Sequence, residues 1–581
     1  MRWSVRPFDP AVVSRLTSEV NILPVIARLL AQRGIETPEA AASFLHPKLE
    51  DLHSPYLMAG MQRAVERLLA AIERQEKILI YGDYDVDGTT AVVILKTGIE
   101  LCGGAADYHV PHRIREGYGM KDDVIERAAA EGVRLIISVD TGIRAFDAAE
   151  TAARLGIDLI VTDHHLPESA QGLVPKAHAV LNPNQPGCEY PCKDLCGAGV
   201  AFKLVQALLE KKKAAAERRK LELSFLKMVA IATIADAVPL RGENRVFAKL
   251  GLEGLRKAAN LGLRALIACA QLDPKQKPLT AADIAFRIAP RLNAAGRMDV
   301  AHDVIELFSV RDEARAKELA EKLNRLNADR QQEEARIIAA IYERLDGDAA
   351  LRESYCIVVD GEDWHRGVIG IAATRVVEKY NRPALVVSKI AGEAHGSGRS
   401  IPAFHLLDAL EACPELFDRF GGHAHAVGFA LPSARVPELR ARLDAYARTK
   451  LTLADFEPSL LIDAEIDFKD ITPALLGSVQ QLEPFGMGNR EPVFAVRDAR
   501  IAVPPKILKE KHLKLRVVAG AGARALDLMG WRLAEMLASH DLKAGEAVEI
   551  ACKLDENTHP DFGGLQLMLC DLRKHSSAVT E

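Results

Sequence analysis

Three aspartates at alternate positions follow a short apolar run, and this pattern is typical of a site for divalent metal ions. Asp83, Asp85 and Asp87 belong to the segment GDYDVDGTT, which comes directly after Ile78–Tyr81. In an extended segment alternate residues face one side, so the three carboxylates are expected to converge. Their mutual repulsion would raise their pKa values unless cations were bound, and Mg²⁺ and Mn²⁺ prefer such oxygen ligands.

A calcium-binding EF-hand is the competing interpretation of this segment. Its loop positions one, three, five and six are matched by Asp83, Asp85, Asp87 and Gly88. The twelfth position requires a bidentate glutamate, but this chain has Ile94 there, and the preceding run is typical of a strand rather than a helix. The pattern therefore favours a metal site at the end of a strand.

Two further groups of candidate ligands end other apolar runs. Asp140 follows Leu135–Val139, and the triplet Asp163–His165 follows Leu159–Thr162. Because the carboxyl ends of neighbouring strands in an open α/β sheet meet in one crevice, these groups are expected to join the three aspartates. Together they predict a two-metal centre, in which the imidazoles favour Mn²⁺ and Mg²⁺ remains an alternative.

Another candidate is a single charge inside an apolar run. Asp236 lies in Met228–Pro239, where a buried carboxylate is costly unless it is paired or coordinated. Two close divalent ions can activate water and stabilise the attacking and leaving oxygens of a phosphodiester, so no nucleophilic side chain is needed. The sequence contains no complete Walker or dinucleotide-binding glycine pattern, and Gly486–Gly488 alone is a weak signal. The chemistry indicated is metal-assisted phosphoester hydrolysis.

The elements expected to position these groups form two α/β blocks. From Lys77 to about Leu240, β-branched runs alternate with alanine-rich helical segments, which predicts parallel strands joined by crossover helices. Leucines at helical spacing among many charges predict a long, mostly solvated connecting helix over Arg311–Leu345. A second α/β block is expected from Tyr355 to about Thr449. The runs expected to be strands are Ile78–Tyr81, Leu135–Val139, Leu159–Val161, Ala179–Leu181, Tyr355–Val359 and Ala384–Val387.

The segment from Asp463 onward has a different pattern. Short alternating runs such as Leu515–Val518 and Ala547–Ala551 predict an all-β module, for which a small Greek-key barrel is the simplest arrangement. Barrels of this kind bind single strands through aromatic side chains and a basic groove. The candidates for such contacts are Phe485, Phe494, Lys506, Lys509, Lys511 and Lys514. Taken one at a time, each of these residues is more typical of a core aromatic or a solvated lysine.

The composition limits the class of protein. The chain has 581 residues, is 49% hydrophobic and carries a formal net charge of −5, so several cores are expected and a protein that coats a polyanion with its whole surface is disfavoured. The first residues lack the apolar core of a signal peptide and no apolar stretch is long enough to cross a bilayer, so a cytoplasmic protein without membrane contact is expected. The nine cysteines predict reduced thiols, and Cys188, Cys192 and Cys196 lack an evident fourth metal ligand.

In chain order, the motifs resemble those of the DHH phosphoesterases, which are named for the triplet at Asp163, His164 and His165. The matching segments are DYDVDGTT, SVDTG, TDHH and ATIADAVPL. Within that superfamily the chain resembles the bacterial RecJ exonucleases from about Ile78 to Asp571. The segments that carry this narrower resemblance are NPNQPGC, LCGAGVAFKL, RIAPRLNAAGR, GSGRS and GGHAHAVGFAL, and their joint order is far more specific than any one of them.

The resemblance implies a 5′→3′ exonuclease that degrades single-stranded DNA to 5′ mononucleotides in recombination and repair. His165 would contact the scissile phosphate. Asp163 would orient an adjacent imidazole without binding a metal ion itself. Two divalent metal ions, Mn²⁺ or Mg²⁺, would be held or supported by Asp83, Asp85, Asp87, Asp140, His164 and Asp236.

The resemblance also implies a pocket for the 5′ phosphate of the strand. The segment GSGRS offers backbone amides, hydroxyls and a guanidinium in what is expected to be a glycine-permitted turn. The candidate substrate-binding residues are Arg113, Arg291, Asn293, Arg297, Ser397, Arg399, Ser400 and His423. If the connecting helix holds the two α/β blocks apart, the cleft between them would admit a flexible single strand and reject a stiff duplex.

The expected organisation has five parts in linear order. They are an N-terminal extension (1–60), a DHH phosphoesterase domain (61–310), the connecting helix (311–350), a DHH-associated domain (351–455) and an OB-fold single-strand-binding domain (456–581). A monomer is expected, with single-stranded DNA bearing a 5′ phosphate as its partner, and the resemblance suggests a single-stranded-DNA-binding protein and a helicase.

Two alternative functions stay open at this stage. A small-substrate DHH phosphoesterase acting on short oligonucleotides would share the metal centre but would not need the added barrel, so the chain length disfavours it. A non-enzymatic single-strand-binding replication scaffold would be expected to have lost metal ligands, so the intact ligand set disfavours it.

Overall fold

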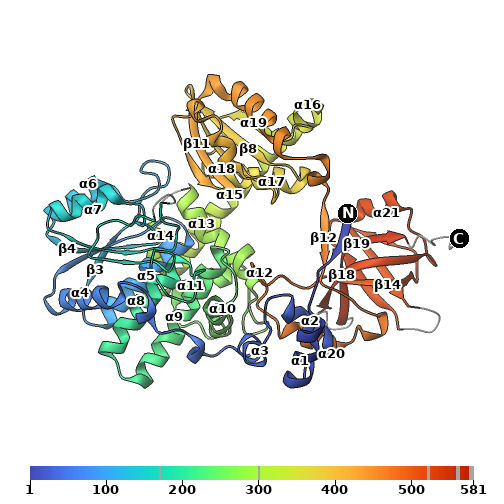
Figure 1. The fold of residues 1–581 in the computed structure, drawn as a ribbon, viewed down its shortest axis with the longest axis horizontal. Helices are drawn as coiled ribbons and strands as arrows, with labels where there is room; N and C mark the ends of the chain where they lie inside the picture. The colour runs from blue at the N-terminus through green and yellow to red at the C-terminus, as the bar shows by residue number, and fades with distance from the viewer. Residues whose placement is uncertain (169–171, 299–300, 520–523, 558–562, 575–581) are drawn as a thin grey trace. The chain divides into compact units, whose positions relative to one another are not determined.

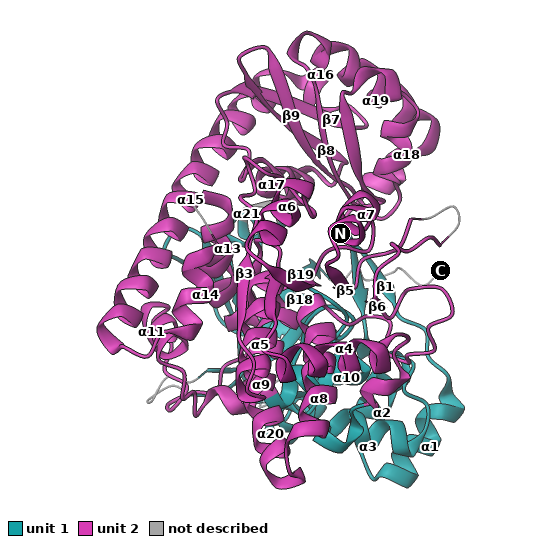
Figure 2. Cartoon of the chain, turned by 90° about the vertical axis from the view of Figure 1, so that its left-hand side faces the viewer, with its two compact units in different colours: residues 1–52, 237–250, 459–581 teal, residues 53–236, 251–458 magenta. Residues whose placement is uncertain are grey.

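The chain folds into two compact units. The computed structural model describes residues 1–168, 172–298, 301–519, 524–557 and 563–574 (Figure 1). One unit, here called the two-sheet unit, combines residues 53–236 and 251–458. The other, here called the barrel unit, combines residues 1–52, 237–250 and 459–581 (Figure 2). The five-part linear division stays a prediction.

A five-stranded parallel sheet forms the first half of the two-sheet unit. Its strand order is β3-β2-β4-β5-β6, and every neighbouring pair is parallel. The central strands are nearly continuous apolar runs because helices cover both faces of the sheet. This confirms the four strands expected here. The bounds are Lys77–Tyr81 (β2), Ala106–His109 (β3), Val133–Val139 (β4), Asp158–Thr162 (β5) and Ala179–Leu181 (β6).

Helices surround this sheet on both faces. The helices α6 and α7 cover one face, while α4, α5 and α8 lie on the other (Figure 1). Most of α5 and α8 is buried, which places their amino-terminal turns inside the protein. The bounds are Met61–Glu73 (α4), Val86–Leu101 (α5), Asp122–Ala130 (α6), Phe146–Arg154 (α7), Gly197–Lys212 (α8) and Ala215–Ala235 (α9).

The expected connecting helix is confirmed as α15, which covers Glu313–Gly347. Asp312 caps its first turn by accepting a hydrogen bond from the backbone N–H of Arg315 at 2.7 Å. One face of the helix is buried along its whole length, from Ala316 to Leu345, and the rest is solvated. The helical segments before and after it in the sequence are Gly242–Leu255 (α10), Leu261–Cys269 (α11), Ala281–Asp283 (α12), a π-helical turn at Ile284–Ile288, Ala289–Met298 (α13), His302–Ser309 (α14) and Ala349–Arg352 (α16).

A second five-stranded sheet forms the other half of the two-sheet unit. Its order is β10-β11-β9-β8-β7, with only β7 and β8 parallel. Helix α17 packs on one face, and α18 and α19 pack on the other. The bounds are Ile357–Glu362 (β7), Ala384–Ile390 (β8), Glu393–Arg399 (β9), Arg419–His423 (β10), Ala426–Pro432 (β11), Ile369–Tyr380 (α17), Leu406–Glu411 (α18) and Val436–Lys450 (α19).

The expected turn at GSGRS is wrong, because this segment is the end of strand β9. Its glycines serve packing rather than a turn. A Cβ added at Gly396 would lie 1.9 Å from the Phe429 ring, and one at Gly398 would lie 2.7 Å from Leu406. The glycines therefore let Phe429 and Leu406 pack tightly on one face of the sheet. The side chains of Ser397 and Arg399 project from the other face, toward α17.

The predicted barrel is confirmed in the barrel unit. Its sheet has the order β13-β14-β18-β19-β17-β16-β15, and a further pairing of β14 with β16 closes it. The barrel strands are Ala464–Glu465 (β13), Phe494–Ile501 (β14), Lys506–Leu508 (β15), His512–Val518 (β16), Leu526–Gly530 (β17), Ala547–Asn557 (β18) and Gly564–Lys574 (β19). Phe494 is fully buried in the barrel core, so it is a core aromatic and not a stacking platform.

Helices from both ends of the chain share the barrel core. Residues of α1 and α2 belong to the same hydrophobic cluster as the barrel strands. Strand β1 (Arg2–Val5) pairs in parallel with β12 (Ser459–Ile462), which joins the start of the chain to this unit. The helices are Pro10–Val20 (α1), Pro24–Ala31 (α2), Pro38–Leu45 (α3), Pro473–Gln480 (α20) and Ala534–His540 (α21). Within the described ranges, every helix is too short or too polar to span a membrane.

A buried arginine ties the barrel unit together, and its removal is expected to destabilise that unit. Arg245 is 2% exposed, stacks on the Phe44 ring at 3.6 Å and donates hydrogen bonds to the carbonyl oxygens of Phe44, Leu482 and Glu483. Arg245→Ala removes all of these hydrogen bonds and leaves the Leu482 carbonyl with the Asn489 side-chain amide as a donor, so we expect a loss of roughly 3 kcal/mol in the free energy of unfolding.

Urea unfolding would measure this loss. Trp3 and Trp531 report on the barrel unit by fluorescence, and a Trp364→Phe background removes the third tryptophan, which lies in the two-sheet unit. Arg2→Ala is the control, because Arg2 is exposed and should change the stability by less than about 0.5 kcal/mol. Equal effects of the two substitutions would contradict the assignment.

Candidate metal centre and phosphate pocket

The three aspartates of GDYDVDGTT converge, but by a different geometry from the extended segment expected. Asp85 is the N-cap of α5 and accepts a hydrogen bond from the backbone N–H of Gly88 at 3.0 Å. Because this cap starts the helix, Asp87 already lies in its first turn. A strand, a loop and a helix start therefore bring the carboxylates together. This arrangement excludes the helix–loop–helix of an EF-hand.

Asp87 is held by the start of another helix. Its carboxylate accepts hydrogen bonds from the backbone N–H groups of Gly197 at 2.6 Å and Ala198 at 2.8 Å, in the first turn of α8. A Cβ added at Gly197 would lie 2.5 Å from the Asp140 side chain. Position 197 therefore requires glycine, so that α8 can approach both carboxylates closely.

Asp140 has an unusual backbone conformation at the end of β4. Its φ is +59°, in the left-handed region that non-glycine residues rarely adopt. Strain of this kind persists where the surrounding structure enforces it, and it clusters at functional sites. Here it turns the carboxylate toward the triplet that follows β5.

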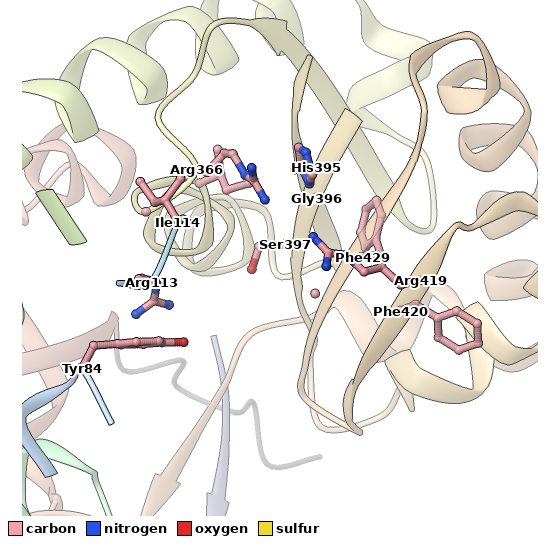
Figure 3. A pocket seen from close by; sticks show the side chains of 13 residues that line it. Tyr84, Arg113, Ile114, Arg366, His395, Gly396, Ser397, Arg419, Phe420 and Phe429 are labelled. Atoms are coloured by element: carbon pink, nitrogen blue, oxygen red, sulfur yellow. The ribbon is translucent and has the colours of Figure 1, made fainter. Parts of the chain in front are cut away.

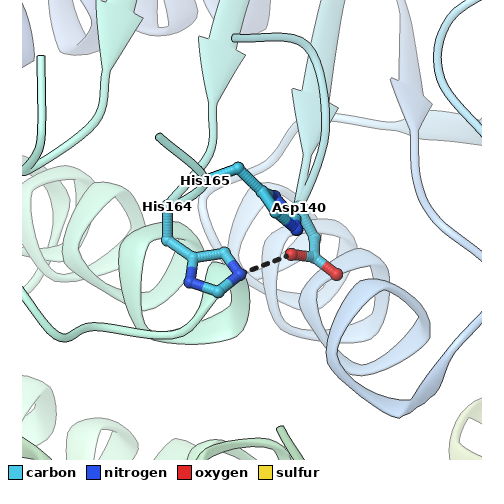
Figure 4. A group of neighbouring side chains, drawn as sticks. All are labelled: Asp140, His164 and His165. Atoms are coloured by element: carbon cyan, nitrogen blue, oxygen red, sulfur yellow. Dashed lines mark ion pairs between the residues drawn. The ribbon is translucent and has the colours of Figure 1, made fainter. Parts of the chain in front are cut away.

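His164 lies at the centre of the acidic residues. Its Nε2 atom is 3.2 Å from Asp140 Oδ1, 3.7 Å from Asp236 Oδ2 and 3.8 Å from Asp87 Oδ2 (Figure 4 shows the first of these pairs). Three sets of side chains have donor atoms within 4.8 Å of one another, and Asp140 belongs to two of them. The sets are Asp83, Asp85 and Asp140; Asp87, His164 and Asp236; and Asp140, His164 and His165.

The donor set fits divalent cations. Asp83 Oδ1 and Asp140 Oδ1 are buried and accept no hydrogen bond from any described residue, so both oxygens are free to coordinate. Carboxylate oxygens with one or two imidazoles suit Mn²⁺ and Mg²⁺ better than zinc, which favours thiolates in sites of this kind.

The electrostatics of the site also require cations. Burial raises the pKa values of Asp83, Asp140 and Asp236 well above their usual range, and neighbouring carboxylates raise them further. Burial lowers the pKa of His164, which favours the neutral imidazole that a metal ligand must be. Bound positive charge would remove the repulsion among these groups.

Asp163 and His165 form a second pair beside this centre. Asp163 Oδ1 lies 2.7 Å from His165 Nδ1, and the same carboxylate accepts hydrogen bonds from the backbone N–H groups of His164, His165 and Ile143. Burial opposes the charge on both residues. The hydrogen bond between them outweighs it, which lowers the pKa of Asp163 and raises the pKa of His165 to about 9. The hydrogen bond thereby orients His165 and favours its charged form.

Three residues that support the triplet were missed from the sequence. The side-chain amides of Asn182 and Asn184 donate to the carbonyl oxygens of His165 at 2.9 Å and His164 at 3.0 Å. The Tyr118 hydroxyl lies 3.4 Å from His165 Nδ1. Their types and spacing carry no chemical signal of their own, although the asparagines lie in the segment NPNQPGC.

Several of the candidate phosphate-binding residues come together around Arg297, near the end of α13. Arg297, which is half-buried, donates to the Gly367 carbonyl at 2.7 Å, and Arg399 donates to Ser397 Oγ at 3.2 Å. Burial and the charges of Arg113, Arg330 and Arg399 lower the pKa of Arg297 to about 10. A cluster of arginines without an equal number of carboxylates is an arrangement suited to an anion.

Arg113 and Ser397 line a cavity of about 340 Å³ (Figure 3). The Arg113 guanidinium also lies 4.8 Å from the centre of the Tyr84 ring. Tyr84 belongs to the GDYDVDGTT loop, so this loop contributes both to the metal centre and to the cavity. Arg366, His395 and Arg419 line the same cavity and were missed, because single basic residues in no motif give no signal in a sequence.

Four other candidates make structural contacts instead of facing the cavity. Asn293 Oδ1 accepts from the Val86 backbone N–H at 3.1 Å, so Asn293 holds the loop of the three aspartates. Arg291 donates to Asn324 Oδ1 at 2.9 Å. Ser400 donates to the Phe404 carbonyl at 2.7 Å, and the exposed His423 accepts from the His425 backbone N–H at 3.3 Å. The structure does not bring Arg291, Ser400 or His423 to the metal centre.

Comparisons with known proteins agree with this geometry. Family profiles match the DHH family N-terminal domain at residues 77–233, the DHHA1 domain at 352–449 and the RecJ OB domain at 462–571. The single-stranded-DNA-specific exonuclease RecJ of Bacillus subtilis is 37% identical over 98% of this chain and 70% of its own length. The RecJ protein of Dickeya dadantii is 35% identical over 96% of this chain and 97% of its own length. The chain belongs to the RecJ family.

A solved structure supports the family assignment. RecJ from Thermus thermophilus in complex with Mn²⁺ superimposes with a TM-score of 0.83 at 29% identity, covering 99% of this chain and 79% of that one. The same protein with Mg²⁺ gives a TM-score of 0.76. The RecJ fold of this chain therefore extends over both α/β halves and the barrel.

The cysteine segment is not part of the metal centre. Cys188 Sγ accepts from the Ala59 backbone N–H at 3.5 Å, and Cys196 Sγ lies 3.6 Å from Thr233 Oγ1. Among the described residues, none of the possible metal-binding groups includes a cysteine. In the described part of the chain, Cys188, Cys192 and Cys196 are not joined by disulfides.

Proposed function

We propose that this protein is a 5′→3′ exonuclease that degrades single-stranded DNA to 5′ mononucleotides by hydrolysis with two divalent metal ions, Mn²⁺ or Mg²⁺, in DNA recombination and repair. The observation that carries the proposal is the meeting of Asp83, Asp85, Asp87, Asp140, His164 and Asp236 at one edge of a parallel sheet, beside an arginine-lined cavity. The RecJ relatives, which are named single-stranded-DNA-specific exonucleases, support the substrate.

The residues of the site have separate roles in the proposed hydrolysis. When bound, two divalent cations supply neutralisation of phosphate charge and acidification of water. The carboxylates and His164 would hold them. His165, kept cationic by Asp163, would donate a hydrogen bond to an oxygen of the scissile phosphate and stabilise the charge that develops there. Water adds to phosphorus, and the 3′ oxygen leaves and takes up a proton.

The polarity of the reaction would follow from the cavity lined by Arg113, Arg366 and Arg419, here called the arginine cavity. A 5′ phosphate bound by Arg113, Ser397 and Arg399 would fix the first nucleotide, so that the next phosphodiester bond lies at the metal centre. Each cut would then release one 5′ mononucleotide and leave a new 5′ phosphate on the strand. This arrangement supports repeated removal from the 5′ end.

The preference for a 5′ phosphate is expected to weaken in Arg399→Gln. Loss of a charge-assisted hydrogen bond of about 1.5–3 kcal/mol should reduce the ratio of kcat/KM for 5′-phosphate and 5′-hydroxyl strands roughly 10- to 100-fold. Activity on the 5′-hydroxyl strand should change little. The measurement is digestion of two strands that differ only at the 5′ end, with Arg442→Gln, an exposed arginine on α19, as the control. An unchanged ratio would argue against this assignment.

The barrel supplies further contacts with the strand in this proposal. Lys506, Lys509 and Lys511 are exposed on or beside the β15–β16 hairpin, whereas Lys514 is paired with Asp527 at 2.9 Å. Such lysines suit the backbone of a single strand. A monomer that acts with a helicase and a single-stranded-DNA-binding protein in the cytoplasm is the cellular setting that we propose.

One experiment tests the function and its alternatives. A long single strand labelled at either end is digested with Mn²⁺ or with a chelator, beside a blunt duplex. We expect metal-dependent release of 5′ mononucleotides from the 5′ end and no attack on the duplex. Release from the 3′ end would reject the polarity, cleavage of very short strands alone would favour a small-substrate phosphoesterase, and no hydrolysis with retained strand binding would favour a scaffold.

A further inference from the structure

The arginine cavity extends beyond the residues assigned to a 5′ phosphate. Its volume of about 340 Å³ is roughly ten times the volume of about 30 Å³ that one water molecule occupies in the liquid, and it lies at the lower end of ordinary ligand pockets. A single phosphate group would leave much of this space unused. The remainder is bordered by Arg366, His395 and Arg419 (Figure 3).

The sheet shapes this additional space. Across the strands, His395 pairs through Ala430 with Arg419, and in the next row Ser397 pairs through Gly428 with Gly421. Directly paired residues project from the same face, and successive rows on one face are about 7 Å apart. His395 and Arg419 therefore lie one row beyond Ser397, on the side away from Arg399.

Glycines keep the middle row open. A Cβ added at Gly421 or at Gly428 would meet no atom within 4 Å, so both positions face open space rather than a packed neighbour. Ser397 is then the only side chain in its row on these three strands. The result is a trough between the row of Arg399 and the row of Arg419, with room for a ligand longer than one phosphate.

The charges in this space are not balanced by carboxylates. Within the described part of the chain, Arg113, Arg366 and Arg419 form no salt bridge. Glu393, the carboxylate that acts on Arg366, is 77% exposed and lies 3.4 Å from His395 Nε2. Burial and the charge of Arg419 lower the pKa of Arg366. Basic groups placed together at this cost suit a ligand with several negative charges.

We propose that the part of the cavity beside Arg366, His395 and Arg419 binds the β- and γ-phosphates of a strand that ends in a 5′ diphosphate or triphosphate. The α-phosphate of that end would occupy the place of the 5′ monophosphate at Ser397 and Arg399. This assignment rests on the proposed exonuclease function and specifies which strand ends it accepts.

The reaction on such a strand balances without a further reactant. One water adds to the phosphorus between the first and second nucleotides, the bond from that phosphorus to the 3′ oxygen breaks, and the 3′ oxygen takes up a proton. The products are a free nucleoside triphosphate and a strand with a 5′ monophosphate. The anhydride bonds of the triphosphate are untouched.

This specificity implies which class of reaction makes the substrate. A polymerase that starts a strand without a primer leaves the triphosphate of its first nucleotide at the 5′ end. Strand initiation of this kind must therefore supply the substrate. After the first cut, the remaining strand is an ordinary 5′-monophosphate substrate of the same enzyme.

The test compares three strands of one sequence that carry a 5′ triphosphate, a 5′ monophosphate or a 5′ hydroxyl. With Mn²⁺, the triphosphate strand should be cut with a kcat/KM within about threefold of the monophosphate strand, and its first product should be a nucleoside triphosphate. Arg366→Gln combined with Arg419→Gln should lower kcat/KM at least about tenfold for the triphosphate strand and less than about threefold for the monophosphate strand. Arg442→Gln should change neither.

Binding of the same strands in chelator, measured by fluorescence anisotropy, gives a readout without turnover. The triphosphate strand should bind more tightly than the monophosphate strand, and the double variant should remove this difference. Resistance of the triphosphate strand while the monophosphate strand is degraded would overturn the inference. Equal losses on both strands, or a dinucleotide as the first product, would overturn it too. If no strand is cut, the proposed function fails, and the binding comparison still decides whether the subsite exists.

Discussion

Asp140→Asn is expected to lower kcat/KM roughly 10³-fold or more, because it removes a charge shared by two groups of candidate metal ligands. The substitution should not disturb the backbone. Asparagine tolerates the left-handed conformation that Asp140 adopts at φ +59°, and its side chain has nearly the same shape. The loss should therefore report on charge and coordination rather than on folding.

The same substitution should make the metal-free protein more stable. Burial and the charges of Asp87, Asp85 and Asp236 raise the pKa of Asp140, so the folded state holds its proton more tightly than the unfolded state. A carboxyl whose folded pKa is raised destabilises the fold as pH rises from its unfolded pKa through its folded pKa, and the penalty is complete above that range. At neutral pH in chelator, Asp140→Asn should raise Tm by roughly 1–2 °C, the shift that about 1 kcal/mol gives in a unit as large as residues 53–236 with 251–458.

Calorimetry in chelator and in excess Mn²⁺ would separate these effects. The difference in Tm between variant and wild type should be positive in chelator and negative with Mn²⁺, because only the wild type gains fully from the cation. Asp107→Asn is the matched control, since Asp107 is exposed on β3, the edge strand of the same sheet. A variant that is less stable in both conditions would show that Asp140 acts as a structural acceptor.

The parallel sheet could be predicted from the sequence because its central strands are buried on both faces and read as continuous apolar runs. Strand β3 was missed because Ala106–His109 is short and carries polar residues at an edge of the sheet. The ends of β4 and β5 could be matched to Asp140 and the triplet, since parallel strands present their carboxyl ends at one edge. The left-handed backbone of Asp140 gives no signal in a sequence.

The phosphate cavity was harder to predict, because sheet pairing between distant segments creates it. Ser397 and Arg399 belong to a recognisable motif, but Arg419 reaches the same trough only through two antiparallel pairings. The glycines of GSGRS also led to a wrong prediction of local structure. They suggested a turn, whereas Gly396 and Gly398 are in a strand where Phe429 and Leu406 leave no room for a side chain.

Asp163→Asn is expected to lower kcat roughly 10²- to 10³-fold with little change in KM, because Asp163 sets the orientation and the charge of His165 rather than binding the strand. The carboxylate accepts four hydrogen bonds. Three come from His164 and His165, and the fourth comes from the Ile143 backbone N–H. An amide in its place turns one acceptor into a donor, so the imidazole of His165 loses both its fixed position and the charge that holds its proton.

A double-mutant cycle with His165→Gln tests whether the two residues act as one unit. Each single variant should lose a similar amount of kcat, and the double variant should lose at most about tenfold more than either, because the second substitution removes an interaction that is already broken. His165→Gln leaves the backbone contacts of Asp163 in place, so it also controls for damage to the loop. Losses that multiply would show that Asp163 and His165 contribute independently, with Asp163 maintaining the loop and His165 acting on the phosphate without its help.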